Sequence, residues 1–135
     1  MTGVQTCALP ISAAAQTAIW EWDISRDSIW ITEQGRELFG IAPGADVTIE
    51  RLQALVHPDD RSRISSEVAK SLRDAATFER EYRIVPSGGT LRWISTRGTV
   101  ELDAAGRPSI MRGLSIDITE RKRAQESIEI GRAHV

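Results

Sequence analysis

The chain has few of the residues on which several classes of protein depend. Its 135 residues include one cysteine and two histidines, which excludes an internal disulfide framework and the usual multi-cysteine metal sites. The net charge of −2 provides no basic field for nucleic acid or for an anionic membrane surface. No apolar run approaches the ~20 residues of a membrane-spanning helix. The expected setting is therefore cytoplasmic and reducing, with neither nucleic acid nor a membrane in contact with this segment.

What the chain does contain is an ordinary globular composition. Apolar residues make up 41% and charged residues 27% of the sequence, which is enough to build a packed core with a solvated surface. At 135 residues the length suits one domain with a single core.

The two ends of the chain lack the periodicity of the rest. Residues 1–11 match the translation of a sequencing-library adapter read from a GTG start codon, and the reverse complement of that adapter encodes residues 130–135 followed by a stop codon. Opposite strands of one oligonucleotide at opposite ends indicate non-native segments at 1–11 and 129–135. The natural part is then a fragment of a longer protein, in which residues 12–17 are the remnant of a preceding linker or helix.

The first half of the natural part predicts two strands followed by three helices. Alternation of Trp20, Trp22 and Ile24 with acidic residues predicts a half-buried strand over 18–24, and a turn then leads to a second strand over 28–31. Thr32 and Thr48 are expected to cap the first two helices, and Gly40 is expected to follow the C-terminus of the first. The third and longest helix is predicted over 58–75, beginning at Pro58. It carries an apolar stripe at a spacing of four residues, made of Ile64, Val68 and Leu72.

The second half predicts three strands and a terminal helix. The hydrophobic period changes to two after Ala76, and a glycine-rich loop joins the predicted strands 77–85 and 91–102 into a hairpin. Pairing of Glu79 or Glu81 with Arg97 is expected to fix the hairpin register. A last strand over 109–118 precedes a charged helix that Thr119 is expected to cap and that is expected to end near residue 128. This order predicts an α+β fold with the helices on one face of an antiparallel sheet.

Seven segments in this order resemble a PAS domain of the third PAS-fold subgroup, which is common in bacterial signalling proteins. The matching segments are "WEWD" (20–23), "ELFG" (37–40), "VHPDDR" (56–61), "FEREYRIV" (78–85), "GGTLRWISTRG" (88–98), "DAAGRP" (103–108) and "MRGLSIDITERK" (111–122). The resemblance implies a five-stranded antiparallel sheet in the order 2-1-5-4-3, with helices on its inner face. It places the domain at 18–118 and the start of a signalling helix at 119–128.

"VHPDDR" contains a histidine and two carboxylates, which raises the question of catalysis. Pro58 suits the first position of a helix, and Asp59 and Asp60 place negative charge at the positive end of its dipole. The sequence therefore favours a structural motif made of His57, Pro58, Asp59, Asp60 and Arg61. A small hydrolase that uses His57 with Asp59 or Asp60 is a distant alternative, and a pH-sensing His57 is a further one.

The cofactor of such a domain is unknown from the sequence. A covalent flavin needs a reactive cysteine, which the natural part lacks, and the resemblance implies that His57 does not occupy the position of a haem ligand. Flavin bound without a covalent bond stays an alternative. If a small-molecule site exists, we expect it between the sheet and the helices from Thr32 to Ala75. The candidate residues are the apolar or small ones that point inward: Phe39, Leu52, Leu55, Ile64, Val68, Tyr82, Ile94 and Ser115.

Four tryptophans lie on the predicted strands, and core or interface packing explains them better than a planar ligand does. Trp93 and Ile94 point to opposite faces of one strand, so we expect an apolar cover on both sides, with a dimer partner or a flanking helix on the outer face.

The resemblance implies a sensory and dimerisation module of a multidomain protein, such as a two-component sensor histidine kinase or a cyclic-dinucleotide enzyme. It implies no catalytic activity of the module, self-association in the parent protein and a downstream effector domain in the same chain. We expect Asp117, Ile118 and Thr119 to relay the signal from the sheet to the C-terminal helix. A purely structural linker or dimerisation domain without a ligand is the alternative.

Overall fold

The computed structural model describes residues 16–133, which form one antiparallel sheet and its covering helices. The elements follow one another in the order β1 (Thr17–Asp23), β2 (Ser28–Ile31), α2 (Glu33–Phe39), α3 (Ile49–Leu55), α4 (Pro58–Asp74), β3 (Phe78–Ile84), β4 (Arg92–Leu102), β5 (Pro108–Asp117) and α5 (Thr119–Ala133). The five predicted strands agree with these bounds to within one residue at each end.

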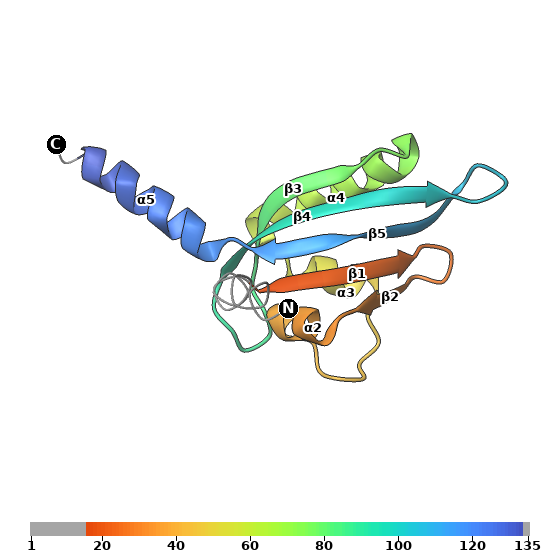
Figure 1. Cartoon of the computed structure of the whole chain (residues 1–135), viewed down its shortest axis with the longest axis horizontal. Coiled ribbons are helices and arrows are strands. Elements are labelled where there is room, and N and C mark those ends of the chain that lie inside the picture. The colour runs from red at the N-terminus through yellow and green to blue at the C-terminus, as the bar shows by residue number, and fades with distance from the viewer. Residues whose placement is uncertain (1–15, 134–135) are drawn as a thin grey trace, which may run out of the picture.

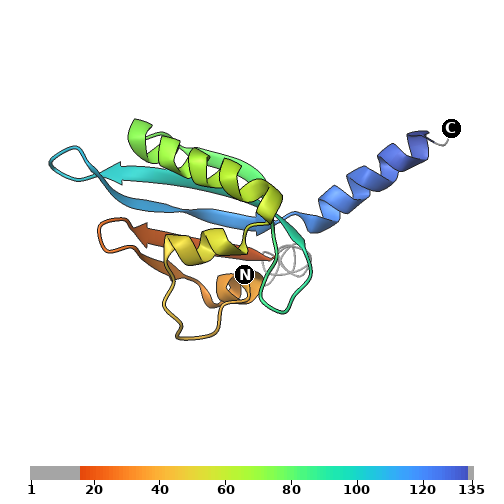
Figure 2. The same ribbon diagram turned by 180° about the vertical axis from the view of Figure 1, so that it is seen from behind.

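The sheet has the strand order β2-β1-β5-β4-β3, and all of its neighbouring strands are antiparallel. This confirms the fold that the resemblance implied. Helices α2, α3 and α4 lie on one side of the sheet (Figures 1 and 2). Strand β5, the last in the sequence, lies at the centre of the sheet because it pairs with both β1 and β4.

The helix ends follow the caps that the sequence predicted. The Thr32 hydroxyl accepts the Gly35 N–H at 3.2 Å, and the Thr48 hydroxyl accepts the Arg51 N–H at the same distance. Gly40 ends α2 with a φ of 71°, a left-handed conformation in which a side chain would be strained. Local sequence is sufficient to set these boundaries because each cap satisfies backbone groups of its own helix.

The core lies between the inner face of the sheet and the helices. Period-two alternation places Tyr82, Ile94 and Trp22 on this face, and all three side chains are buried. Ile84 and Ile94 have no exposed surface at all. The predicted stripe of α4 faces the same core, because Ile64 and Val68 are buried.

The terminal helix departs from its expected length. Helix α5 continues to Ala133, past the predicted end near residue 128, and it points away from the body of the domain (Figure 1). No proline lies between Thr119 and Ala133, so nothing in the backbone forces an earlier end. The expected non-native segment 1–11 lies outside the described residues.

Candidate functional site

A partly open cavity of about 70 Å³ lies between the sheet and the helices. Sixteen residues line it, and none of them is charged: Trp20, Trp22, Ile29, Ile31, Phe39, Ile49, Leu52, Gln53, Val56, Ile64, Val68, Phe78, Tyr82, Thr96, Met111 and Ser115. Clefts and cavities that are mostly apolar and contain a few converging polar groups are the usual form of small-molecule sites.

Six of the eight residues predicted for such a site line this cavity. Phe39, Leu52 and Ser115 do so, as do Ile64, Val68 and Tyr82. Leu55 and Ile94 do not line it. Ile94 is paired with Asp117 at the far end of β5, and Leu55 ends α3, where its carbonyl accepts the Val85 N–H at 2.7 Å. Sequence parity assigned the correct face to Ile94, but it carried no information about how far along the strand the cavity extends.

The polar part of the lining is a chain of buried hydroxyls that crosses the sheet. The Tyr82 hydroxyl lies 2.7 Å from the Thr96 hydroxyl, which lies 2.7 Å from the Ser115 hydroxyl. The indole N–H of Trp20 donates to Ser115 Oγ at 3.1 Å. These four residues come from β3, β4, β5 and β1 respectively, so the chain connects the strands on which any ligand would rest. Burial raises the pKa of the Tyr82 phenol, and the nearby Thr96 and Ser115 hydroxyls act in the opposite direction.

Two facing glycines make room for the Trp20 ring over the sheet. Gly98 and Gly113 are paired on β4 and β5, and a Cβ atom on either would lie 2.7 Å from the Trp20 ring. Such a contact is far inside van der Waals range, so only glycine permits the ring to lie this close to the strands. Packing was the role expected for Trp20 as a large ring on a strand, but its two partner glycines could not be foreseen, because they lie 78 and 93 positions away in the chain.

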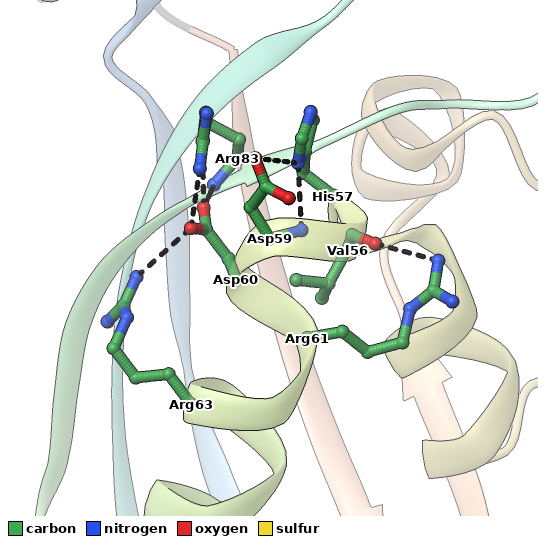
Figure 3. A network of polar contacts seen from close by, with 7 residues as sticks. All are labelled: Val56, His57, Asp59, Asp60, Arg61, Arg63 and Arg83. Carbon is green, nitrogen blue, oxygen red and sulfur yellow. Dashed lines mark hydrogen bonds and ion pairs between the residues drawn. The ribbon is translucent and has the colours of Figure 1, made fainter.

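The "VHPDDR" segment begins a helix, as predicted, and also anchors it to the sheet (Figure 3). His57 is the N-cap of α4, and its Nδ1 accepts the Asp59 N–H at 3.1 Å. Asp60 accepts from Arg83 three times, from the backbone N–H and Nε at 3.0 Å and from a terminal guanidinium nitrogen at 2.7 Å. The Arg83 hydrogen bond lowers the pKa of Asp60 to about 2. This pair could not be foreseen from local sequence patterns, because Asp60 and Arg83 lie on different elements.

The residues of this segment do not form a catalytic arrangement. Asp60 is 7% exposed and occupied by Arg83, whereas Asp59 points into solvent with a side chain that is 76% exposed. His57 does not line the cavity. Within residues 16–133 no group of three histidine, cysteine, aspartate or glutamate side chains is placed to hold a metal ion.

The junction between β5 and α5 is held by a compact set of hydrogen bonds. Asp117 Oδ1 accepts from the Thr119 N–H at 2.8 Å and from the Thr119 hydroxyl at 2.5 Å, while Oδ2 accepts from Arg92 at 2.7 Å. The Thr119 hydroxyl in turn accepts the Trp93 N–H at 2.9 Å. The prediction that Thr119 caps the first turn of α5 was wrong, because β4 takes the acceptor that a cap would offer.

The first turn of α5 also contacts the outer face of the sheet. Glu81 pairs with Lys122 at 2.7 Å and with Arg121 at 2.6 Å, and these two cations lower the pKa of the Glu81 carboxyl. The Lys122 ammonium lies 4.7 Å from the centre of the Trp93 ring, within the range of a cation–π contact. The cover expected over Trp93 is thus supplied, at least in part, by the helix that follows the sheet.

The fold and the junction can be compared with known proteins. A family model described as the PAS fold matches residues 28–115. The chain belongs to the PAS fold family. Within residues 16–133 this PAS domain has no helix that combines the length and the apolar character needed to cross a bilayer.

The similar proteins are sensors and signalling enzymes. The chain is 30% identical over 115 residues to a blue-light-activated histidine kinase of Brucella anthropi, a match that covers 85% of this chain and 23% of that protein. It is 27% identical over 124 residues to the probable diguanylate cyclase DgcE of Escherichia coli, with 90% and 11% covered. A solved structure of a sensory box histidine kinase/response regulator from Burkholderia thailandensis has a TM-score of 0.75 at 26% identity, with 94% and 96% covered. The chain thus spans less than a quarter of the length of the histidine kinase of Brucella anthropi and of DgcE.

Proposed function

We propose that this PAS domain is the sensory and dimerisation module of a larger signal-transduction protein, a histidine kinase or a diguanylate cyclase. In this proposal the domain has no catalytic activity of its own, and it regulates an effector domain in the same chain through α5. The two kinds of effector are those of the similar proteins.

The observation that carries the proposal is the junction of β5 with α5. Asp117 ends the central strand, and its carboxylate holds Thr119 at the start of the helix. Thr119 is at the same time bonded to the backbone of Trp93 in β4. A shift of β5 against β4 therefore has to alter the bonds that orient the first turn of α5. Buried, charge-assisted bonds of this kind transmit a displacement because they have few alternative geometries.

The ion pairs of Glu81 hold the first turn of α5 against the sheet. Its two ion pairs with α5 are partly exposed, since the Glu81 side chain is 39% and the Arg121 side chain 54% exposed. Exposed pairs contribute about 0–1 kcal/mol each, so they are weak enough to be broken by a modest displacement of the sheet. We infer that α5 changes between a state docked on Glu81 and Trp93 and a released one.

Self-association is supported by an apolar pair on the outer face. Ile19 and Leu114 are direct cross-strand neighbours on β1 and β5, and their exposed fractions are 55% and 39%. Their position at the middle of the sheet suits contact with a second copy in the parent protein. Replacing Leu114 with Arg should lower the dimer fraction of the parent protein in sedimentation analysis. An unchanged dimer fraction would remove this face from the proposal.

A structural linker without a ligand is the second candidate. A linker needs only a filled core, whereas this domain has a partly open cavity lined by converging hydroxyls. That cavity favours the sensor. The hydrolase alternative has no support in the contacts of His57 and Asp60, which are those of a helix start.

The relay can be tested in the full-length parent protein by replacing Asp117 and Thr119 with Ala. We expect the effector to lose its response to the signal while the domain stays folded by circular dichroism. Lys122→Ala should change the ratio of stimulated to basal activity, because it removes contacts with both Glu81 and Trp93. Arg123→Ala is the matched control, since Arg123 is exposed and forms no ion pair with the side chains of residues 16–128. An unchanged response in the Asp117/Thr119 variant would disprove the relay.

A further inference from the structure

Helix α4 is connected to α5 by four side chains that pass over β3, the edge strand of the sheet. Asp60 in the first turn of α4 accepts two hydrogen bonds from the Arg83 guanidinium (Figure 3). The guanidinium carbon of Arg83 lies 5.6 Å from the centre of the Trp93 ring, and the Lys122 ammonium lies 4.7 Å from the same centre. Both distances are within the range of a cation–π contact. We call Asp60, Arg83, Trp93 and Lys122 the edge bridge.

The charges of the edge bridge depend on one another. Two cations at one aromatic ring repel each other unless each is neutralised by a carboxylate. Asp60 neutralises Arg83 at 2.7 Å, and Glu81 neutralises Lys122 at 2.7 Å. The side chains of Asp60, Arg83 and Lys122 are at most 27% exposed, so water and salt screen them less than they screen charges on the open surface. Loss of the negative charge of Asp60 should therefore weaken the docking of Lys122.

The same part of α4 also reaches the cavity. Ile64 follows Asp60 by four residues, so the two side chains lie on one face of the helix. Both are buried, and Ile64 lines the cavity. A molecule that displaces Ile64 therefore also displaces the carboxylate that holds Arg83.

A further hydrogen bond ties α4 to the residue that docks α5. Arg63 lies in the turn between Asp60 and Ile64, and its guanidinium donates to the Glu81 carbonyl oxygen at 3.1 Å. The Glu81 side chain pairs with Lys122. A movement of α4 is thus transmitted to β3 at two positions, Glu81 and Arg83, and both contact the first turn of α5 or the ring beneath it.

We propose that α4 controls the docking of α5 through the edge bridge, so that a displacement of α4 at the cavity releases α5. In the docked state Asp60 neutralises Arg83, and Lys122 stays on the Trp93 ring. This inference rests on the proposed sensory function and gives its output helix a second input besides the junction of β5 with α5. The two inputs meet at Trp93, whose backbone N–H donates to Thr119 and whose ring belongs to the edge bridge.

Amide hydrogen exchange in the 135-residue chain, followed by NMR, tests the coupling. The Lys122 N–H donates to the Ile118 carbonyl oxygen at 3.0 Å, so its protection reports the docking of the first turn of α5. Asp60→Asn keeps the size of the side chain but removes its charge, and we expect it to lower the protection of Lys122 about threefold. The amide of Ile94, which is fully buried, reports global unfolding and shows whether the loss is local.

Asp59→Asn is the matched control for this variant. It removes the same charge one residue earlier, from a side chain that is 76% exposed, and should leave the protection of Lys122 within about 1.5-fold. Unchanged protection in Asp60→Asn, or an equal loss in the two variants, would overturn the proposal.

Reciprocity supplies a second test that leaves the core intact. A coupling between two sites acts by the same factor in both directions. Lys122→Met should therefore speed the exchange of the Arg83 Nε–H, which donates to Asp60 at 3.0 Å, about threefold. Arg123→Met is the control, since Arg123 is exposed and forms no ion pair with the side chains of residues 16–128. Equal exchange rates in these two variants would contradict the coupling.

The role of the ring can be tested by repeating Asp60→Asn in a Trp93→Leu background. Without the ring nothing holds the two cations near each other, so Asp60→Asn should then change the protection of Lys122 by less than about 1.5-fold. A threefold loss that persists would show that the coupling does not pass through Trp93, and it would refute the edge bridge. No effector takes part in these measurements, so their failure is distinguishable from a failure of the relay through Asp117 and Thr119.

Discussion

The two faces of the sheet handle polar groups in opposite ways. On the inner face, no charged side chain lines the cavity. The hydroxyls of Tyr82, Thr96 and Ser115 and the Trp20 indole N–H bond to one another there. On the outer face the polar groups are charged, and they form exposed pairs such as Arg112 with Glu21 at 2.9 Å and with Glu101 at 2.6 Å. The same strands supply both sets because successive side chains of a strand point to opposite faces.

The difference shows where each kind of interaction contributes to stability. A polar group that loses water has to find a partner, so the inner hydroxyls specify one arrangement of four strands. Outer charges keep their water, so each pair contributes little and can be exchanged. A site that binds a ligand suits the first environment, and a helix that has to dock and release suits the second.

The Asp60–Arg83 pair tests this comparison, because its side chains are charged like those of the outer face but Asp60 is buried. Asp60→Ala should lower the free energy of unfolding by about 3 kcal/mol, since Arg83 then loses three hydrogen bonds. Urea unfolding measures this change. The neighbouring Asp59→Ala is the matched control and should cost less than about 0.5 kcal/mol. Equal losses in the two variants would mean that burial does not distinguish these carboxylates.

Gly113→Ala tests how closely the inner face is packed. The added Cβ would lie 2.1 Å from the Arg97 carbonyl oxygen and 2.7 Å from the Trp20 ring. We expect a loss of about 2–3 kcal/mol in unfolding free energy, because the β4–β5 pairing has to open. Gly89→Ala, whose nearest neighbour would be 3.3 Å away, should cost less than about 1 kcal/mol. A tolerated Gly113→Ala would show that the strands can move apart at low cost.

Acid pH is expected to reveal how much the ionised carboxylate of Asp60 contributes to stability. The pKa of Asp60 is lowered from 3.8 to about 2 in the folded state, so the unfolded chain binds more protons between these values. The pair therefore contributes about 2 kcal/mol above pH 4, and this contribution is lost as the pH falls towards 2. Urea unfolding at several pH values should show a slope in this window that is smaller in Asp60→Ala. Asp23, Glu81 and Asp103 also have lowered pKa values, so some slope should remain.

The smallest effect is expected on the outer face. Arg112→Ala removes two ion pairs whose side chains are about half exposed, and it should lower the unfolding free energy by less than about 1 kcal/mol. The loss should shrink further in 1 M salt, where charges are screened within about 3 Å. A loss above 2 kcal/mol that salt does not reduce would contradict the contrast between the two faces.

Local patterns in the sequence were enough to place the strands, the caps at Thr32 and Thr48 and the start of α4 at Pro58. Each of these features depends on residues within a few positions of one another, through the period of a strand or the bonds of a single helix turn. The strand order was obtained from the resemblance to PAS domains, since period and caps alone leave the order open.

Only the tertiary structure decided the contacts between distant parts of the chain. Trp20, Tyr82, Thr96 and Ser115 belong to four strands, and their hydroxyl chain exists because the sheet brings them side by side. Threonine often caps helices, but the Thr119 hydroxyl oxygen accepts the Trp93 N–H instead. The sequence by itself thus determined which face each residue occupies, because that choice follows the backbone period. How far along each strand the cavity extends, and which polar groups meet there, depends on packing between elements that no local pattern records.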